Sequence, residues 1–352
     1  MSRVARVAAV ILLLSGCGTA LAQSELAPLL TKSEFSTADA ARVGDWCDQK
    51  ARAVQVASER NDDAAIDKAL AEFEKVAAEK SATPQFRELF GGQCARALGP
   101  LTTGGSLRVA TRITLFFQSL PVPGTREALV AALSAPQSAV RYAAAAGLER
   151  LHPALARPAE FEPVLHALGQ AGVAESDPLA LKQIYRALDM AGSVKEFAGA
   201  DAAAEALLTI LNARVTGVAS GARSLEADLP GFAALADTAP LMKDAALRTR
   251  LVQIAARYLL AVANRYVELG PAGGGAALAG PAESIERALE ALVRAAQSDT
   301  AMPAGGARVS ARIRAKADAK AVRESLAGWI GAEGKPGALN AAPWRLPVGL
   351  SE

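Results

Sequence analysis

Apolar residues spaced three and four positions apart run through most of this sequence, and prolines and glycines separate the runs. Ile66, Leu70, Phe73 and Val76 form one such run, with charged residues at several of the positions between them. This spacing places apolar side chains on one face of an α-helix. Half of the residues are hydrophobic, but only 5% are aromatic, and alanine supplies much of the apolar total. Because that composition suits closely packed helices better than a sheet core, we predict an all-α protein.

The first 22 residues have the order of an export signal. Arg3 and Arg6 precede an apolar run, Val7–Leu14, and small residues follow it. The run is too short to cross a bilayer core, which takes about 20 helical residues. We therefore predict that residues 1–22 form a signal peptide and that the mature chain is exported.

Two cleavage sites fit the end of this signal. Leu14–Cys17 (LSGC) resembles the lipobox of bacterial lipoproteins. The resemblance implies cleavage before Cys17, a lipid on Cys17 that anchors the chain to a membrane, and an outer-membrane location because Gly18 follows the Cys. Ala20–Ala22 (ALA) before Gln23 is a site for ordinary secretion, which would discard Cys17. The two alternatives are an outer-membrane lipoprotein facing the periplasm and a soluble periplasmic or secreted protein.

Cys47 and Cys94 remain in the folded part after either cleavage. An oxidising periplasm would let them pair, and the bridge would join the first and third predicted helices. Closing a loop of about 47 residues would stabilise the fold by about 4 kcal/mol. Two separately buried thiols are the alternative.

The charge of the mature chain argues against nucleic acid as a partner. The full sequence has 38 basic and 36 acidic residues, and Arg3 and Arg6 belong to the signal. The remainder is neutral, whereas nucleic-acid binders usually carry a basic excess or a concentrated basic patch.

Residues 125–151 carry the clearest repeat pattern. An apolar helical face is followed by Pro136, and Val140 and Arg141 then open a second helix with an Ala- and Leu-rich face. The unit resembles the HEAT repeat, which implies an α-solenoid of antiparallel helix pairs in which Arg141 braces the structure. Residues 162–188 are a weaker copy, with a five-residue insertion predicted around residues 171–176. An irregular helical bundle is the alternative architecture.

The breaks along the chain suggest a domain order. We expect a signal peptide (1–22), an N-terminal helical cap (23–104), HEAT-like repeats (105–269), a flexible glycine-rich loop (270–281), C-terminal helices (282–330) and an irregular tail (331–352). In the helix predicted at 282–297, Glu283–Arg287 and Glu290–Arg294 have the spacing of ion pairs on the wet side. In the tail, Trp344 is expected to be exposed.

No recognisable catalytic pattern is present. His152 and His166 fall in different helical elements without a neighbouring cluster of ligands, whereas zinc sites need three or four convergent ligands. Gly273–Gly275 lacks the spacing and the lysine of a phosphate-binding loop. We therefore predict no metal site, no cofactor and no enzymatic activity.

A basic row stands out near the C-terminus. If residues 307–330 form one helix, four basic residues share a row at four-residue spacing: Arg308, Arg312, Lys316 and Lys320. The simpler interpretation is a solvated helix face. The sharper hypothesis is a docking face for anionic lipid headgroups, cell-wall polymer or an acidic partner.

These observations together predict an exported, non-catalytic scaffold of the bacterial cell envelope. A stack of helix pairs can hold another envelope protein or a peptide without reactive side chains. The alternative is an envelope enzyme, or a protein that binds carbohydrate or another ligand, with a carboxylate site in a helical groove. The chain has only 16 aromatic residues, mostly at predicted core positions, which favours the scaffold. No small-molecule ligand is specified.

Overall fold

The computed structural model describes six stretches of the chain: residues 25–155, 157–194, 197–296, 302–332, 335–341 and 343–347. Within these stretches the regular structure is helical, and the only β-type pairing is an isolated antiparallel bridge between Ala332 and Lys335. The all-α prediction is therefore confirmed. The predicted signal peptide, with Cys17, lies outside the described residues.

The chain divides into two compact units, unit 1 (Met1–Ala154) and unit 2 (Leu155–Glu352). The boundary falls inside the segment that we assigned to HEAT-like repeats, not at its start near residue 105. Each unit has its own stack of helices, and each is described separately.

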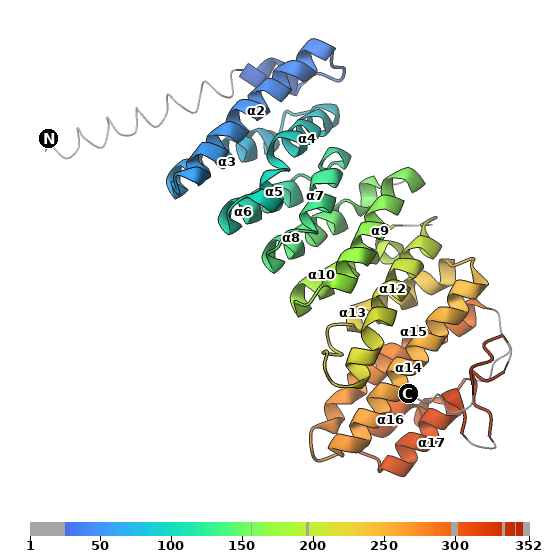
Figure 1. The fold of residues 1–352 in the computed structure, drawn as a ribbon. Helices are drawn as coiled ribbons and strands as arrows, with labels where there is room; N and C mark the ends of the chain where they lie inside the picture. Colours follow the sequence, from blue (N-terminus) through green and yellow to red (C-terminus); the bar gives the residue numbers. More distant parts are fainter. Residues whose placement is uncertain are drawn as a thin grey trace, which may run out of the picture. The chain divides into compact units, whose positions relative to one another are not determined.

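After a short helical stretch at residues 25–30, unit 1 has seven further α-helices in its described residues. They are α2 (Thr37–Glu59), α3 (Asp63–Ala77), α4 (Pro84–Leu98), α5 (Leu101–Gly104), α6 (Leu107–Ser119), α7 (Arg126–Ala132) and α8 (Ser138–Arg150). Side chains just before several helices cap their free N–H groups, for example Asp62, which accepts from the Ala65 amide at the start of α3. Helices α2, α4 and α7 lie in one layer, and α3, α6 and α8 lie in the other (Figure 1). Pairs of helices thus repeat along the unit.

An aromatic cluster fills the first half of this core. The Trp46 ring on α2 meets the Phe73 ring on α3 edge-on at 5.2 Å, and Phe86 stacks on Phe90 within α4 at 5.7 Å. Val43 and Trp46 on α2 are buried in this core. Aromatic residues here serve packing, as their helical spacing predicted.

Helices α7 and α8 correspond to the clearest predicted repeat unit. Arg141 donates from one Nη atom to the carbonyl oxygens of Ala135 and Pro136, both at 2.9 Å. The side chain therefore ties the start of α8 to the turn before it, in agreement with the predicted structural role. A Cβ on Gly147 would lie 2.7 Å from Leu129, so glycine allows α8 to approach α7 closely.

Unit 2 contains nine α-helices in its described residues. They are α9 (Pro158–Ala174), α10 (Pro178–Leu188), α11 (Met190–Ser193), α12 (Ala200–Ala219), α13 (Leu229–Thr238), α14 (Ala245–Leu269), α15 (Ala279–Ala295), α16 (Val309–Arg314) and α17 (Ala319–Ile330). Helix α12 packs on α9 and on α14, and α14 packs on α17; α13 packs on α10 and on α15. The unit thus has a repeat-like order of two helical layers (Figure 1). Among the described helices, α12 alone is long and apolar enough to span a membrane, and its place between α9 and α14 is typical of a core helix.

Three expectations for unit 2 need correction. Helix α9 continues to Ala174, so the extra residues around 171–176 mainly lengthen a helix and do not enlarge a turn. The glycine-rich segment is irregular only at first. A short 3-10 helix follows Gly274, and α15 begins at Ala279. Residues 276–279 are alanine and leucine, which favour a helix. Trp344 is 2% exposed, so this part of the tail packs against the unit.

Candidate functional site

The predicted basic row is broken in the structure. Helix α16 ends at Arg314 and α17 begins at Ala319, so the four residues do not share one helix. Lys316 adopts a left-handed conformation with φ of 52°, and Asp318 caps α17. The expectation of one continuous helix was wrong because the break uses a lysine where a helix end usually has glycine.

The members of that row also have different surroundings. Arg308 forms an ion pair with Glu290 of α15, and the Lys320 Nζ atom lies 4.0 Å from a Glu324 carboxylate oxygen. Glu290 is buried, although we predicted it on the wet side of its helix. It does pair with Arg294, at 3.5 Å, whereas Glu283 pairs with Arg314 of α16 and not with the predicted Arg287.

The two cysteines come together in the core of unit 1. Cys47 on α2 and Cys94 on α4 are fully buried thiols, and their Sγ atoms are 3.8 Å apart. Burial raises the pKa of the Cys94 thiol, and the adjacent Cys47 raises it further. A thiol with a raised pKa is a weak nucleophile, so this pair is not arranged for covalent catalysis.

The two histidines do not form a common site. His152 is buried in unit 1, while His166 is exposed on α9 of unit 2, where its Nε2 atom lies 2.8 Å from the side-chain amide nitrogen of Gln170. No group of three or more metal-ligating side chains occurs among the described residues.

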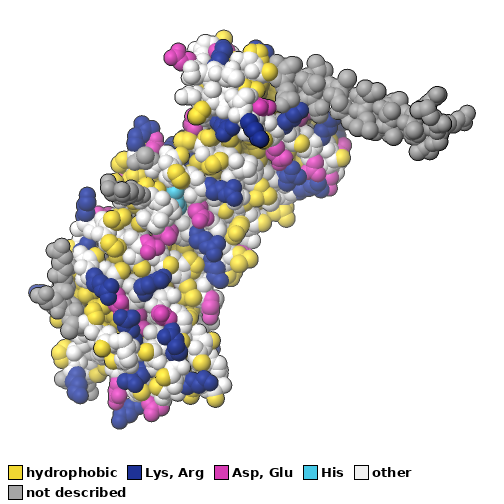
Figure 2. All heavy atoms as spheres, turned by 180° about the vertical axis from the view of Figure 1, so that it is seen from behind, with side chains coloured by type: hydrophobic (Ala, Val, Ile, Leu, Met, Phe, Trp, Pro, Cys, Tyr) yellow, Lys and Arg dark blue, Asp and Glu magenta, His cyan; other side chains and the backbone are white. Residues whose placement is uncertain are grey.

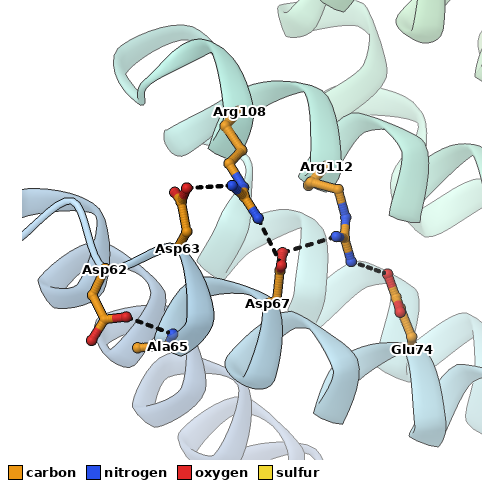
Figure 3. A network of polar contacts seen from close by, with 7 residues as sticks. All are labelled: Asp62, Asp63, Ala65, Asp67, Glu74, Arg108 and Arg112. Atoms are coloured by element: carbon orange, nitrogen blue, oxygen red, sulfur yellow. Dashed lines mark hydrogen bonds and ion pairs between the residues drawn. The ribbon is translucent and has the colours of Figure 1, made fainter.

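An ion-pair network joins α3 to α6 on the surface of unit 1. Figure 3 shows Arg112 bridging Asp67 and Glu74, with nitrogen–oxygen distances of 2.9 and 3.1 Å. Arg108 pairs with Asp67 at 2.7 Å and also with Asp63. All five side chains are at least a third exposed, and solvent screens such pairs. The network therefore orients two helices and offers no chemistry.

Charges of both signs are also mixed elsewhere on the surface. On the face seen in Figure 2, Lys and Arg side chains lie among Asp and Glu and among exposed apolar atoms. This mixture agrees with the near-neutral composition.

A buried carboxylate, Glu286 on α15, holds the C-terminal helices. It accepts from the backbone amides of Val309 and Ser310 at 2.8 and 3.2 Å and from the Ser310 hydroxyl at 2.5 Å. The indole nitrogen of Trp329 on α17 donates to it at 3.0 Å. Because its oxygens are used to cap α16 and to fix α17, Glu286 has a structural role.

The most concentrated buried polar cluster surrounds Asp228, just before α13. Its Oδ1 atom accepts from Arg214 Nε of α12 at 2.6 Å and from the Tyr185 hydroxyl of α10 at 2.9 Å. Its Oδ2 atom accepts from the Tyr258 hydroxyl of α14 at 3.2 Å. Asp228 is 0% exposed and Arg214 is 5% exposed. The cluster joins α10, α12 and α14 to the start of α13 through a single carboxylate.

Local packing and burial define the properties of this cluster. A Cβ on Gly231 would lie 2.6 Å from the Tyr185 ring, so only glycine lets the tyrosine lie against α13. Burial raises the pKa of Asp228, although Arg214 and the two phenols favour the ionised carboxylate. Burial and the nearby Asp228 charge raise the pKa of Tyr185 and Tyr258, so both phenols remain hydrogen-bond donors.

Two hollows on unit 2 provide candidate binding sites. The first, the α12–α14 groove, has a volume of about 230 Å³. Its lining includes apolar Val215, Leu260 and Ala261 and polar Thr216, Ser220, Asn264, Arg257, Arg265 and Glu268. Arg265 pairs with Glu268 at 3.0 Å, whereas the exposed Arg257 has no ion pair within the described residues. Among the described residues, Arg257 is therefore a groove cation without an ion pair, and it lies beside an apolar floor.

The second hollow, the Arg214 pocket, has a volume of about 290 Å³. It lies where α9 ends, α10 begins and the segment after α12 crosses them. Its polar lining residues include Glu175, Arg214 and Arg223, so it borders the Asp228 cluster.

The sequence pattern predicted neither the Asp228 cluster nor the two hollows. Their residues come from separate helices and match no local motif, and only the packing of α10, α12 and α14 brings them together. Compared with known proteins, the chain matches no family model, no curated protein and no solved structure.

Proposed function

We propose that this chain is an exported, non-catalytic binding protein of the bacterial cell envelope, and that it holds another envelope protein or peptide in the α12–α14 groove. The observation that carries the proposal is the groove itself. Its apolar floor suits an apolar side chain of a partner, and the exposed guanidinium of Arg257 suits a neighbouring carboxylate. A scaffold of HEAT-like helix pairs would use its surface in this way.

The use of the buried polar groups supports a structural scaffold over an enzyme. Glu286 and Asp228 are fully buried, and their oxygens accept hydrogen bonds from side chains or amides of neighbouring helices. A general acid or base must reach a proton of its substrate, and neither carboxylate is accessible to one.

Export is supported by the order of residues in the signal segment and by the cysteine pair. The Sγ atoms of Cys47 and Cys94 are close enough that a small movement would join them in an oxidising compartment. The proposal includes a lipid on Cys17 that anchors the chain to the outer membrane, with A-x-A cleavage and a soluble periplasmic or secreted protein as the alternative. Intact-mass measurement of the mature protein, with Cys17→Ser as control, distinguishes the two: only a lipoprotein begins at residue 17 and carries added acyl mass.

Peptide selection tests the groove. The purified chain is screened against a random peptide library, and we expect enrichment of peptides with an acidic residue next to an apolar one. Arg257→Glu should abolish this enrichment, while Arg287→Glu, which changes an exposed arginine on α15, should leave it intact. No enrichment, or enrichment that Arg257→Glu leaves unchanged, contradicts the proposal.

The same variants test partner capture in envelope extract. A protein that the wild type and Arg287→Glu retain, and that Arg257→Glu loses, would be the expected partner. Equal retention by all three would place the partner elsewhere and reject the groove.

A further inference from the structure

The Arg214 pocket contains a buried guanidinium that the protein satisfies only in part. The Nε atom of Arg214 donates to Asp228 at 2.6 Å. Arginine has five N–H donors, and the two Nη atoms, which carry four of them, have no acceptor among the described residues. Neither Nη atom is fully enclosed. Because Arg214 lines the pocket, the two Nη atoms open on it.

A second guanidinium lines the same pocket. Arg223 is exposed, and its side chain lies over α12, where a Cβ on Gly217 would come within 2.9 Å of the Arg223 Cδ atom. Its backbone amide donates to the Gly217 carbonyl at 2.9 Å, which holds the segment in place. No acceptor for its side chain occurs among the described residues. Two arginines thus offer donors to one small space.

The acidic residues at the pocket are already engaged. The Glu175 Oε1 atom accepts from the backbone amides of Ser176 and Asp177 at 2.9 and 2.8 Å. Asp228 lies behind Arg214 and is held by two phenols as well. Both carboxylates therefore direct oxygens toward protein donors, while the Nη groups of both arginines remain open to a ligand.

The remaining walls limit the chemistry of the ligand. Pro178, Leu181 and Ala227 are apolar lining residues, so part of the ligand should be hydrocarbon. A volume of about 290 Å³ is near the lower end for ligand pockets and admits a molecule of on the order of ten non-hydrogen atoms. A planar carboxylate matches the planar fork of an arginine side chain.

We propose that the Arg214 pocket binds a small organic carboxylate, with the carboxylate group between Arg214 and Arg223 and its carbon chain against Pro178 and Leu181. The site is independent of the α12–α14 groove, so it can be present whether or not that groove holds a partner.

Calorimetric titration with succinate at low ionic strength, in a buffer free of carboxylates, tests the proposal. We expect saturable binding to the wild type, about tenfold weaker binding to Arg223→Gln, and unchanged binding to Arg287→Gln, an exposed arginine on α15 that lines neither hollow. Arg223 is exposed, so its replacement should not disturb folding. Hydrogen exchange with bound succinate should slow in residues 175–178 and 220–228.

Two control ligands, succinamide and inorganic phosphate, test whether the pocket recognises a carboxylate. Succinamide, which keeps the shape and lacks the charge, should not bind. Inorganic phosphate that binds as well as succinate would show a general anion site and reject the carboxylate assignment. Absence of saturation by succinate, or equal affinity of the wild type and Arg223→Gln, would reject the pocket.

Discussion

Replacing Asp228 by alanine would leave the Arg214 guanidinium inside unit 2 without its counter-ion. Arg214 is only 5% exposed, and its Nε–Oδ1 contact of 2.6 Å is the only ion pair that it forms in the described residues. The same change removes the acceptor of the Tyr185 hydroxyl. Tyr258 keeps a second acceptor, the Leu211 carbonyl at 3.3 Å. The substitution therefore breaks one buried ion pair and leaves one phenol without a partner.

The size of the effect follows from these contacts. Removing one partner of a buried ion pair costs about 3–5 kcal/mol, and we take about 3 kcal/mol because the pocket admits water to Arg214. An unsatisfied buried hydroxyl adds about 1 kcal/mol. Asp228→Ala should therefore lower the free energy of unfolding of unit 2 by about 4 kcal/mol.

Native-state hydrogen exchange is the suitable assay, because a chain with two compact units need not unfold in one step. Amide hydrogens in peptides covering α12 and α13 should exchange faster in Asp228→Ala than in the wild type. The factor should correspond to the loss of about 4 kcal/mol in the free energy of unfolding. Asp237→Ala removes an exposed carboxylate from α13 and should change the free energy by less than about 0.5 kcal/mol. Equal exchange in the two variants would refute the reasoning. Adding Arg214→Met to Asp228→Ala should restore part of the stability, since it removes the unpaired charge.

Three further substitutions test other contacts. Glu286→Gln replaces a carboxylate that accepts from four donors on α16 and α17, so exchange in α16 should report a loss of about 2 kcal/mol. Gly231→Ala should push the Tyr185 ring from its place and cost about 1–3 kcal/mol by the same assay, while no change would show that the helices shift freely. The side chain of Lys32, with help from Ser36, lowers the pKa of the Asp39 carboxyl to about 2, so its contribution to stability is complete above pH 3.8 and is lost as the pH falls through about 2. Asp39→Asn should flatten the acid titration of Trp46 fluorescence in that window, and an unchanged titration would contradict this assignment.

The tertiary structure changes the interpretation of the C-terminal charges most. A single helix over residues 307–330 would place Arg308 and Lys316 in one row. Arg308 instead reaches back to Glu290, and the turn at Lys316 redirects the chain. No local sequence pattern predicts this ion pair or this turn, because the ion pair joins residues 18 positions apart and the turn lacks a glycine.

Local chemistry in the sequence determined the helices and several of their starts and turns. Asp62 and Asp177 mark helix starts because a short side chain can reach free amides within its own turn, and Arg141 braces a turn only a few residues away. The Asp228 cluster, the Arg214 pocket, the burial of Trp344 and the juxtaposition of the two thiols depended on the packing of elements far apart in the chain. Periodicity fixes which face of a helix is buried, but it does not specify which other helix covers that face. The helical fold is therefore encoded locally, whereas each candidate site exists only after the helices of its unit have packed.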